Sequence, residues 1–206
     1  MFKNTLFTLR GSLLALALAG CASFASADTS YHATIDTSSM SGAGWLDLTF
    51  LPGMASAAGA TATLSNFSGN FGSELDLTGD VGGALPGSFT MGNSQSYNEM
   101  IQALTLGGSF SFDISFSGAY QSTPGTGTSL GVGLLSGDQS AYLGNPDGYL
   151  FQIDLTPMQD SKLSMFAGDI ASVTAAAAVP EPSQYLLLLG GLCVLGAVTA
   201  RRRSAR

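Results

Sequence analysis

Ser109-Phe110-Ser111-Phe112-Asp113-Ile114-Ser115-Phe116-Ser117 is the stretch of this sequence that most directly decides the fold. Apolar and polar side chains alternate along it without a break. Successive side chains of a β-strand point to opposite faces, so this alternation predicts a strand with one face in a core and the other in water. The rest of the chain can be compared with this pattern.

Similar alternation recurs on both sides of that stretch. It predicts further strands at 31–37, 45–50, 60–64, 129–135, 149–155 and 162–170. Clusters of turn residues separate them, at 41–44, 79–83 and 145–148. Only 97–104 has a pattern that would suit a turn or two of helix. Many short strands with almost no helix predict an all-β domain, an antiparallel β-sandwich of jelly-roll type. Its expected core is Ile35, Leu46, Leu48, Leu64, Phe110, Phe112, Ile114, Phe116, Leu150 and Ile153.

The first 27 residues are typical of a signal peptide. Lys3 and Arg10 precede an apolar run at 13–19, and Ala25 and Ala27 form the small-residue pattern before a cleavage site, so signal peptidase would leave Asp28 as the mature N-terminus. An alternative cut precedes Cys21, because Leu18-Ala19-Gly20-Cys21 resembles a lipobox in which this cysteine is lipidated. Either cut exports the domain.

The other end of the chain carries three features in order. Val179-Pro180-Glu181-Pro182-Ser183 precedes the uncharged apolar run 185–200, and Arg201, Arg202 and Arg203 follow. The apolar run predicts a transmembrane helix of roughly 24 Å at about 1.5 Å per residue. The arginines are expected to stay cytoplasmic and stop the helix in the membrane. The predicted organisation is a signal peptide at 1–27, a β-sandwich ectodomain at 28–170, an Ala-rich linker at 171–178 and a sorting tail at 179–206.

This tail resembles the PEP-CTERM sorting signal, in which a Pro-Glu-Pro box, an apolar helix and terminal arginines occur together. The resemblance implies recognition by an exosortase at Pro180, Glu181 and Pro182, release from an inner-membrane precursor, and a bacterium that exports polysaccharide. A plain C-terminal membrane anchor is the alternative. The segment 31–116 also resembles the ectodomain of an uncharacterised PEP-CTERM subfamily, through 35–37, 41–44, 64–69 and 110–113. That likeness implies no site residues.

Charge and cysteine content restrict what the domain does. Between 28 and 178, Lys162 is the only basic residue against thirteen acidic ones, a formal charge of −12. Such a field repels phosphates, so no nucleic-acid partner is expected. Both cysteines, Cys21 and Cys193, lie in the predicted targeting segments, so no disulfide framework is expected in the domain.

Candidate sites are few. His32 is the sole histidine, which leaves little for a catalytic triad or a zinc site and favours an ordinary strand residue. Calcium takes oxygen ligands from acidic loops, and two segments are rich enough: Asp76 and Asp80 with Glu74, and Asp138 and Asp147 with Asn145. Neither has the spacing of a known calcium loop. With thirteen acids, a glycosidase-like carboxylate pair cannot be told from chance.

Aromatic residues offer a second kind of site, since sugars stack on exposed rings. The candidates are Trp45, Tyr97, Tyr120, Tyr142 and Tyr149. The sequence therefore predicts a non-enzymatic structural or interaction protein of the cell surface or extracellular matrix, with no required cofactor and with exopolysaccharide as a candidate partner. Its alternatives are a calcium-supported, lectin-like glycan-binding module and a secreted hydrolase with a carboxylate pair.

Overall fold

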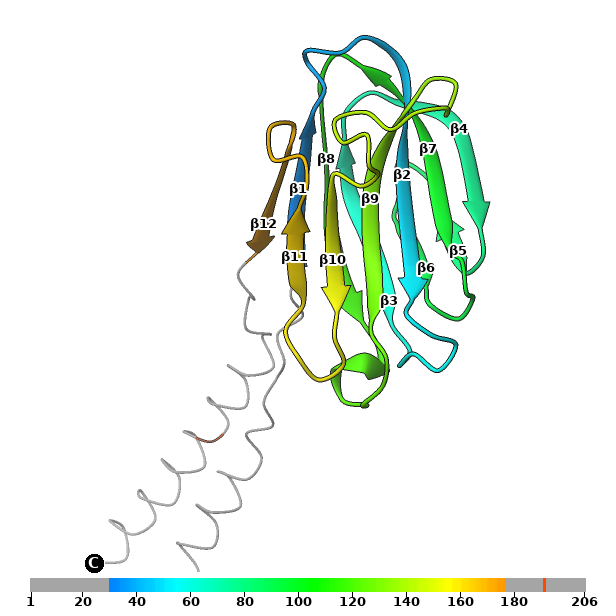
Figure 1. The fold of residues 1–206 in the computed structure, drawn as a ribbon, viewed down its shortest axis with the longest axis vertical. Coiled ribbons are helices and arrows are strands. Elements are labelled where there is room, and N and C mark those ends of the chain that lie inside the picture. Colours follow the sequence, from blue (N-terminus) through cyan, green and yellow to red (C-terminus); the bar gives the residue numbers. More distant parts are fainter. Residues whose placement is uncertain (1–29, 177–190, 192–206) are drawn as a thin grey trace, which may run out of the picture.

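The computed structural model describes residues 30–176 and Gly191, and within 30–176 the chain is a two-layered antiparallel β-sandwich (Figure 1). Sheet A contains, in order, β12 (Ala171–Ala176), β1 (Ser30–Asp36), β8 (Ser109–Ser117), β3 (Thr61–Ser68), β6 (Phe89–Gly92) and β5 (Val81–Gly83). Sheet B contains β11 (Lys162–Met165), β10 (Phe151–Leu155), β9 (Thr128–Ser136), β2 (Gly42–Pro52), β7 (Glu99–Leu106) and β4 (Phe71–Thr78). A 3₁₀ turn, η1 (Ala119–Gln121), follows β8.

The order of strands resembles that of a jelly roll, except that β5 pairs with β6 in sheet A and not with β4 in sheet B. The first, eighth, third and sixth strands are neighbours in one sheet, and the second, seventh and fourth are neighbours in the other. Chain segments therefore cross from sheet to sheet in two Greek-key turns. Strands β9, β10, β11 and β12 extend both sheets beyond this unit.

The core lies between the two sheets and is built from the inward side chains of alternating strands. All ten residues expected there are at most 2% exposed. Phe112 stacks on Phe67, and Phe116 stacks on Phe50 across the two layers. Strand β8 has the bounds that its alternation predicts, 109–117, and lies between β1 and β3 in sheet A.

Two expectations about local structure are wrong. The segment 97–104, whose pattern would suit a turn or two of helix, lies mostly in strand β7, whose inward side chains Met100 and Leu104 are buried in the core between the two sheets. The segment 171–178 was expected to be a linker. Its residues 171–176 are instead strand β12, which pairs with β1 from Ser30↔Ala176 to Ile35↔Ala171.

This pairing places the first and last described strands side by side. Strand β1 runs upward in Figure 1 and β12 runs downward, so Ser30 and Ala176 lie at the same end of the sandwich. We call this end the anchor end and the opposite one the distal end. Strands β2, β4, β8 and β10 finish at the anchor end, and β3, β7, β9 and β11 begin there.

Candidate functional site

The outer face of sheet B carries a buried carboxylate beside a strip of bare backbone. On β2, Leu46 and Leu48 point into the core, so Asp47 and Thr49 point outward. Their partners on β9 are Gly133 and Gly131. Two glycines on the same face leave a shallow gap in the side-chain layer, which another part of the chain must cover.

Two tyrosines of the loop between β9 and β10, residues 137–150, cover that gap. A Cβ atom on Gly131 would lie 2.5 Å from the ring of Tyr149, and one on Gly133 would lie 2.9 Å from the ring of Tyr142. The Thr49 hydroxyl donates to the Tyr149 oxygen at 2.7 Å. The Tyr142 hydroxyl donates to Oδ2 of Asp47 at 3.1 Å. The long loop is thus held flat against the sheet.

Asp47 lies in an unfavourable environment for a negative charge. The residue is 2% exposed, and its Oδ1 is buried without a hydrogen-bond partner. Burial raises the pKa of Asp47 to about 6, repulsion from Glu99 adds to the rise, and the hydrogen bond from Tyr142 opposes it. Burial first, and then Asp47, raises the pKa of Tyr142 to about 12.

Tyr97 completes this group at the start of β7. The residue is 46% exposed, and its hydroxyl donates to Glu99. That hydrogen bond, with burial and the neighbouring carboxylates, raises the pKa of Tyr97. We call Asp47, Glu99, Tyr97, Tyr142 and Tyr149 the tyrosine–carboxylate patch. It combines aromatic rings with negative charge on one face, which suits sugars and cationic groups.

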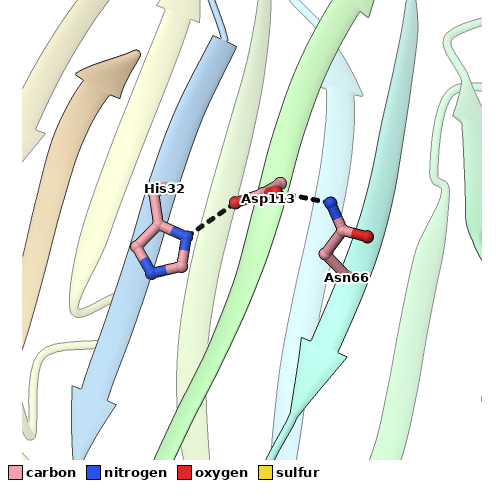
Figure 2. A network of polar contacts seen from close by, with 3 residues as sticks. All are labelled: His32, Asn66 and Asp113. Carbon is pink, nitrogen blue, oxygen red and sulfur yellow. Dashed lines mark hydrogen bonds and ion pairs between the residues drawn. The ribbon is translucent and has the colours of Figure 1, made fainter.

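The outer face of sheet A carries a smaller polar network (Figure 2). His32 on β1, Asp113 on β8 and Asn66 on β3 lie on three adjacent strands. His32 Nδ1 lies 2.6 Å from Asp113 Oδ1, and the Asn66 amide donates to Asp113 Oδ2 at 2.7 Å. Asn66 first, and then His32, holds the pKa of Asp113 below its usual value.

This network resembles the histidine–carboxylate half of a catalytic triad, but the triad is incomplete. His32 is 49% exposed in its side chain, and no hydrogen bond joins it to a serine or cysteine within 30–176. Asn66 has a φ of 54° at an irregularity in the pairing of β3 with β8. The local backbone therefore turns the Asn66 amide toward Asp113, and the network cross-links three strands.

The four acids expected to hold calcium lie in two separate places. Asp76 is on β4, and Asp80 follows that strand and accepts a hydrogen bond from Ser94 at the anchor end. Asp138 and Asp147 belong to the loop at the distal end, where Asp138 accepts bonds from Ser136 and Ser140. Those bonds hold the pKa of Asp138 at about 2. Within the described residues, no three His, Cys, Asp or Glu side chains gather in a way that could hold a metal ion.

The structure brings together three of the five aromatic candidates. Tyr97, Tyr142 and Tyr149 belong to the tyrosine–carboxylate patch. Trp45 lies on the same strand as Asp47, and its indole donates to the Gly137 carbonyl at 3.0 Å. Tyr120, in η1, is only 9% exposed and is part of the core.

Asp47 and Glu99 were not singled out from the sequence. The available signal was an acid between two leucines in an alternating strand, together with the Gly131-Val132-Gly133 alternation. The sorting and processing residues expected at Cys21, Ala25, Ala27, Asp28, Val179–Ser183 and Arg201–Arg203 lie outside the described residues.

Comparison with protein families gives one match. Residues 178–203 match the PEP-CTERM protein-sorting motif, and the chain thus carries the tail of a PEP-CTERM protein. No curated protein and no solved structure matches the chain. The motif implies an exported protein, made as a membrane-anchored precursor and sorted by an exosortase. None of the helices within the described residues is both long and apolar enough to cross a bilayer.

Proposed function

We propose that this chain is a non-enzymatic interaction protein of the cell surface or extracellular matrix, which an exosortase releases from its membrane-anchored precursor. The observation that carries the proposal is the position of the sorting motif. Its match begins at residue 178, and the last strand of the sandwich ends at Ala176. A folded β-sandwich is thus delivered outside the cell with almost no spacer, as suits a protein that acts through its surfaces.

Intact-mass analysis of the protein recovered from medium and envelope of its own host tests this route. A species that begins at Asp28 and ends near Pro182 is expected. A replacement of Pro180, Glu181 and Pro182 by alanine should leave the precursor full-length and membrane-bound. An unchanged C-terminus in the wild-type protein would instead indicate a plain membrane anchor.

A second candidate function is glycan binding at the tyrosine–carboxylate patch, with exopolysaccharide as the partner. It is favoured by the exposed ring of Tyr97 beside Glu99 and by the two rings that lie on glycines of β9. Aromatic faces bind the apolar faces of sugars, and carboxylates accept hydrogen bonds from sugar hydroxyls.

Affinity electrophoresis of the protein in gels that contain the host's exopolysaccharide tests this candidate. Tyr97→Ala should reduce retardation severalfold. Phe166→Ala is the matched control, because Phe166 is a similarly exposed aromatic residue outside the patch, directly after the edge strand β11. Equal retardation of both variants and the wild type would exclude the patch. Addition of EDTA tests calcium support, because a calcium-dependent module would lose retardation.

The non-enzymatic part of the proposal is supported by the burial of Asp47, the carboxylate of the patch whose pKa is raised. Asp47 has the raised pKa that a general acid needs, but the residue is 2% exposed and the Tyr142 hydroxyl occupies its Oδ2. A hydrolase needs both carboxyl groups open to substrate. Release of reducing sugar by the wild type, with loss of that activity in Asp47→Asn, would contradict the proposal.

A further inference from the structure

The anchor end of the sandwich differs from the distal end in its exposed side chains. Five large hydrophobic residues of the described chain are exposed: Met54, Tyr97, Met158, Met165 and Phe166. The first three lie in connections at the anchor end. Met54 and Met158 are 65% and 61% exposed, more than the other three.

The connections that carry them are also nearly without charge. The anchor end consists of residues 53–60, 79–80, 93–98, 118–127 and 156–161, and among these only Asp80 and Asp160 are ionisable acids or bases apart from two tyrosines. Asp80 is already bonded to Ser94. A protein surface in water normally mixes charge throughout, so a charge-poor surface with exposed methionines needs an explanation.

Backbone hydrogen bonds tie the loops of Met54 and Met158 to the loop between them. Gly53 N donates to the Gly127 carbonyl at 2.9 Å, and Met158 N donates to the Tyr120 carbonyl at 2.9 Å. Tyr120 N in turn donates to the Gly59 carbonyl at 3.1 Å. The two methionines are therefore presented by one connected platform.

Met158 is held in an uncommon conformation. Its φ of 61° is in the left-handed region, which a residue with a Cβ atom seldom adopts. The turn, held by the hydrogen bond from Met158 N to the Tyr120 carbonyl, presents the Met158 side chain to solvent.

We propose that the anchor end is a membrane-contact surface, and that Met54 and Met158 enter the bilayer interface while the precursor is anchored. The inference rests on the proposed route of sorting. The sorting motif begins at residue 178 and the apolar run expected to insert in the membrane begins at residue 185, nine residues after Ala176, so the anchor end is the end of the sandwich from which the chain continues to the lipid. Flexible, uncharged methionines suit the boundary between headgroups and acyl chains. The few charges at this end are of both signs, Asp80 and Asp160 in the connections and Lys162 at the start of β11, which suits a zwitterionic lipid face.

Site-specific fluorescence on the full-length precursor tests the contact. Cys21 and Cys193 are replaced by alanine, and single cysteines at Met54, Met158 or Phe166 carry an environment-sensitive fluorophore. Each protein is reconstituted in phosphatidylcholine vesicles, with and without brominated acyl chains. Phe166→Cys is the matched control, because Phe166 is 54% exposed but follows the end of β11 that points away from the anchor end, level with the middle of β9.

At positions 54 and 158 the fluorophore should show blue-shifted emission and lose most of its intensity with brominated lipid, and at position 166 it should do neither. Equal, water-like emission at all three positions in protein that floats with the vesicles would overturn the membrane contact and leave the sorting route intact. Protein that does not float with the vesicles would overturn the anchored precursor, and the contact with it. Thermal unfolding of each labelled chain confirms that the fold is retained.

Discussion

Asp47 is a buried carboxylate whose ionised form destabilises the fold. Its side chain lies on the outer face of β2, where a residue is normally exposed, yet Tyr142 and the neighbouring strands bury it. Its Oδ1 has no partner, so ionisation inside the fold is penalised. The cost depends on pH, because a protonated Asp47 has no charge to bury.

Replacement of this residue should therefore stabilise the protein at neutral pH. The folded pKa of about 6 lies above the ordinary value of 3.8, so the favourable protonated state is lost as pH rises from about 4 to above 6. Asp47→Asn should be more stable than the wild type by about 2–3 kcal/mol at pH 7. The two proteins should converge below pH 4. Thermal unfolding of the exported protein across this range measures the difference.

Asp113→Asn is the control for that measurement, because the pKa of the Asp113 carboxyl is lowered in the fold, whereas that of Asp47 is raised. The ionised form of Asp113 is favoured in the fold by Asn66 and His32, so stability is present above pH 3.8 and is lost as pH falls below it. The variant should be no more stable than the wild type at pH 7. A gain in stability for both variants would show that general charge repulsion, and not burial of Asp47, is responsible.

Among the elements, β12 is a strand that its own sequence pattern does not predict. Its sequence, Ala-Ser-Val-Thr-Ala-Ala, has a single large apolar residue, and Ala171 is its only buried one. A strand at the edge of a sheet that buries little carries little periodic signal. Its existence depends on the free edge of β1, which lies about 140 positions earlier in the chain and is invisible to a local pattern.

The same reasoning explains the other differences from expectation. Strand β8, covered on one face and paired on both edges, follows from its sequence alone. Strands β4 and β5 were not expected, because they border their sheets and their inward residues, such as Leu75 and Val81, are only half-buried. Strand β6 was not expected either, although its inward residues are fully buried, because its four residues are too few for a periodic signal. The aromatic candidates were visible as residues, but the gap that Tyr142 and Tyr149 cover depends on the register of β9 against β2.

Truncation tests the role of β12. A chain that ends at Ile170 should have a free energy of unfolding lower by on the order of 3–6 kcal/mol than one that ends at Ala176. The six register pairs of β1 and β12 form about six hydrogen bonds, and each contributes about 0.5–1 kcal/mol. Urea unfolding compares the two chains. Equal midpoints would mean that 171–176 is a linker after all, in agreement with the sequence-based expectation.

At the scale of the whole molecule, the dominant property is charge. The segment 28–178 carries −12, and Lys162 is its only basic residue. Self-repulsion of this size destabilises a compact state and is screened by salt. It also offers any divalent cation a general attraction, which has to be separated from a specific calcium site.

Ionic strength and calcium are separated by one comparison. Sodium chloride should raise the melting temperature of the exported protein gradually as it screens the repulsion. If Asp76 and Asp80, or Asp138 and Asp147, hold calcium, then calcium chloride should raise it further than magnesium chloride at equal ionic strength. Equal shifts for the two salts would count against a specific site, and Asp138→Asn and Asp80→Asn would then leave the calcium response unchanged.

The antiparallel pairing of β1 with β12 also determines how the sandwich responds to mechanical force. If the C-terminal end is fixed and a partner pulls on the distal end, tension runs along β12 and strains its six register pairs together in shear. If tension is applied between Ser30 and Ala176, the same strands separate like a zipper, one pair after another. A surface protein tethered through its tail and bound at its far loops is pulled in the stronger of these two directions.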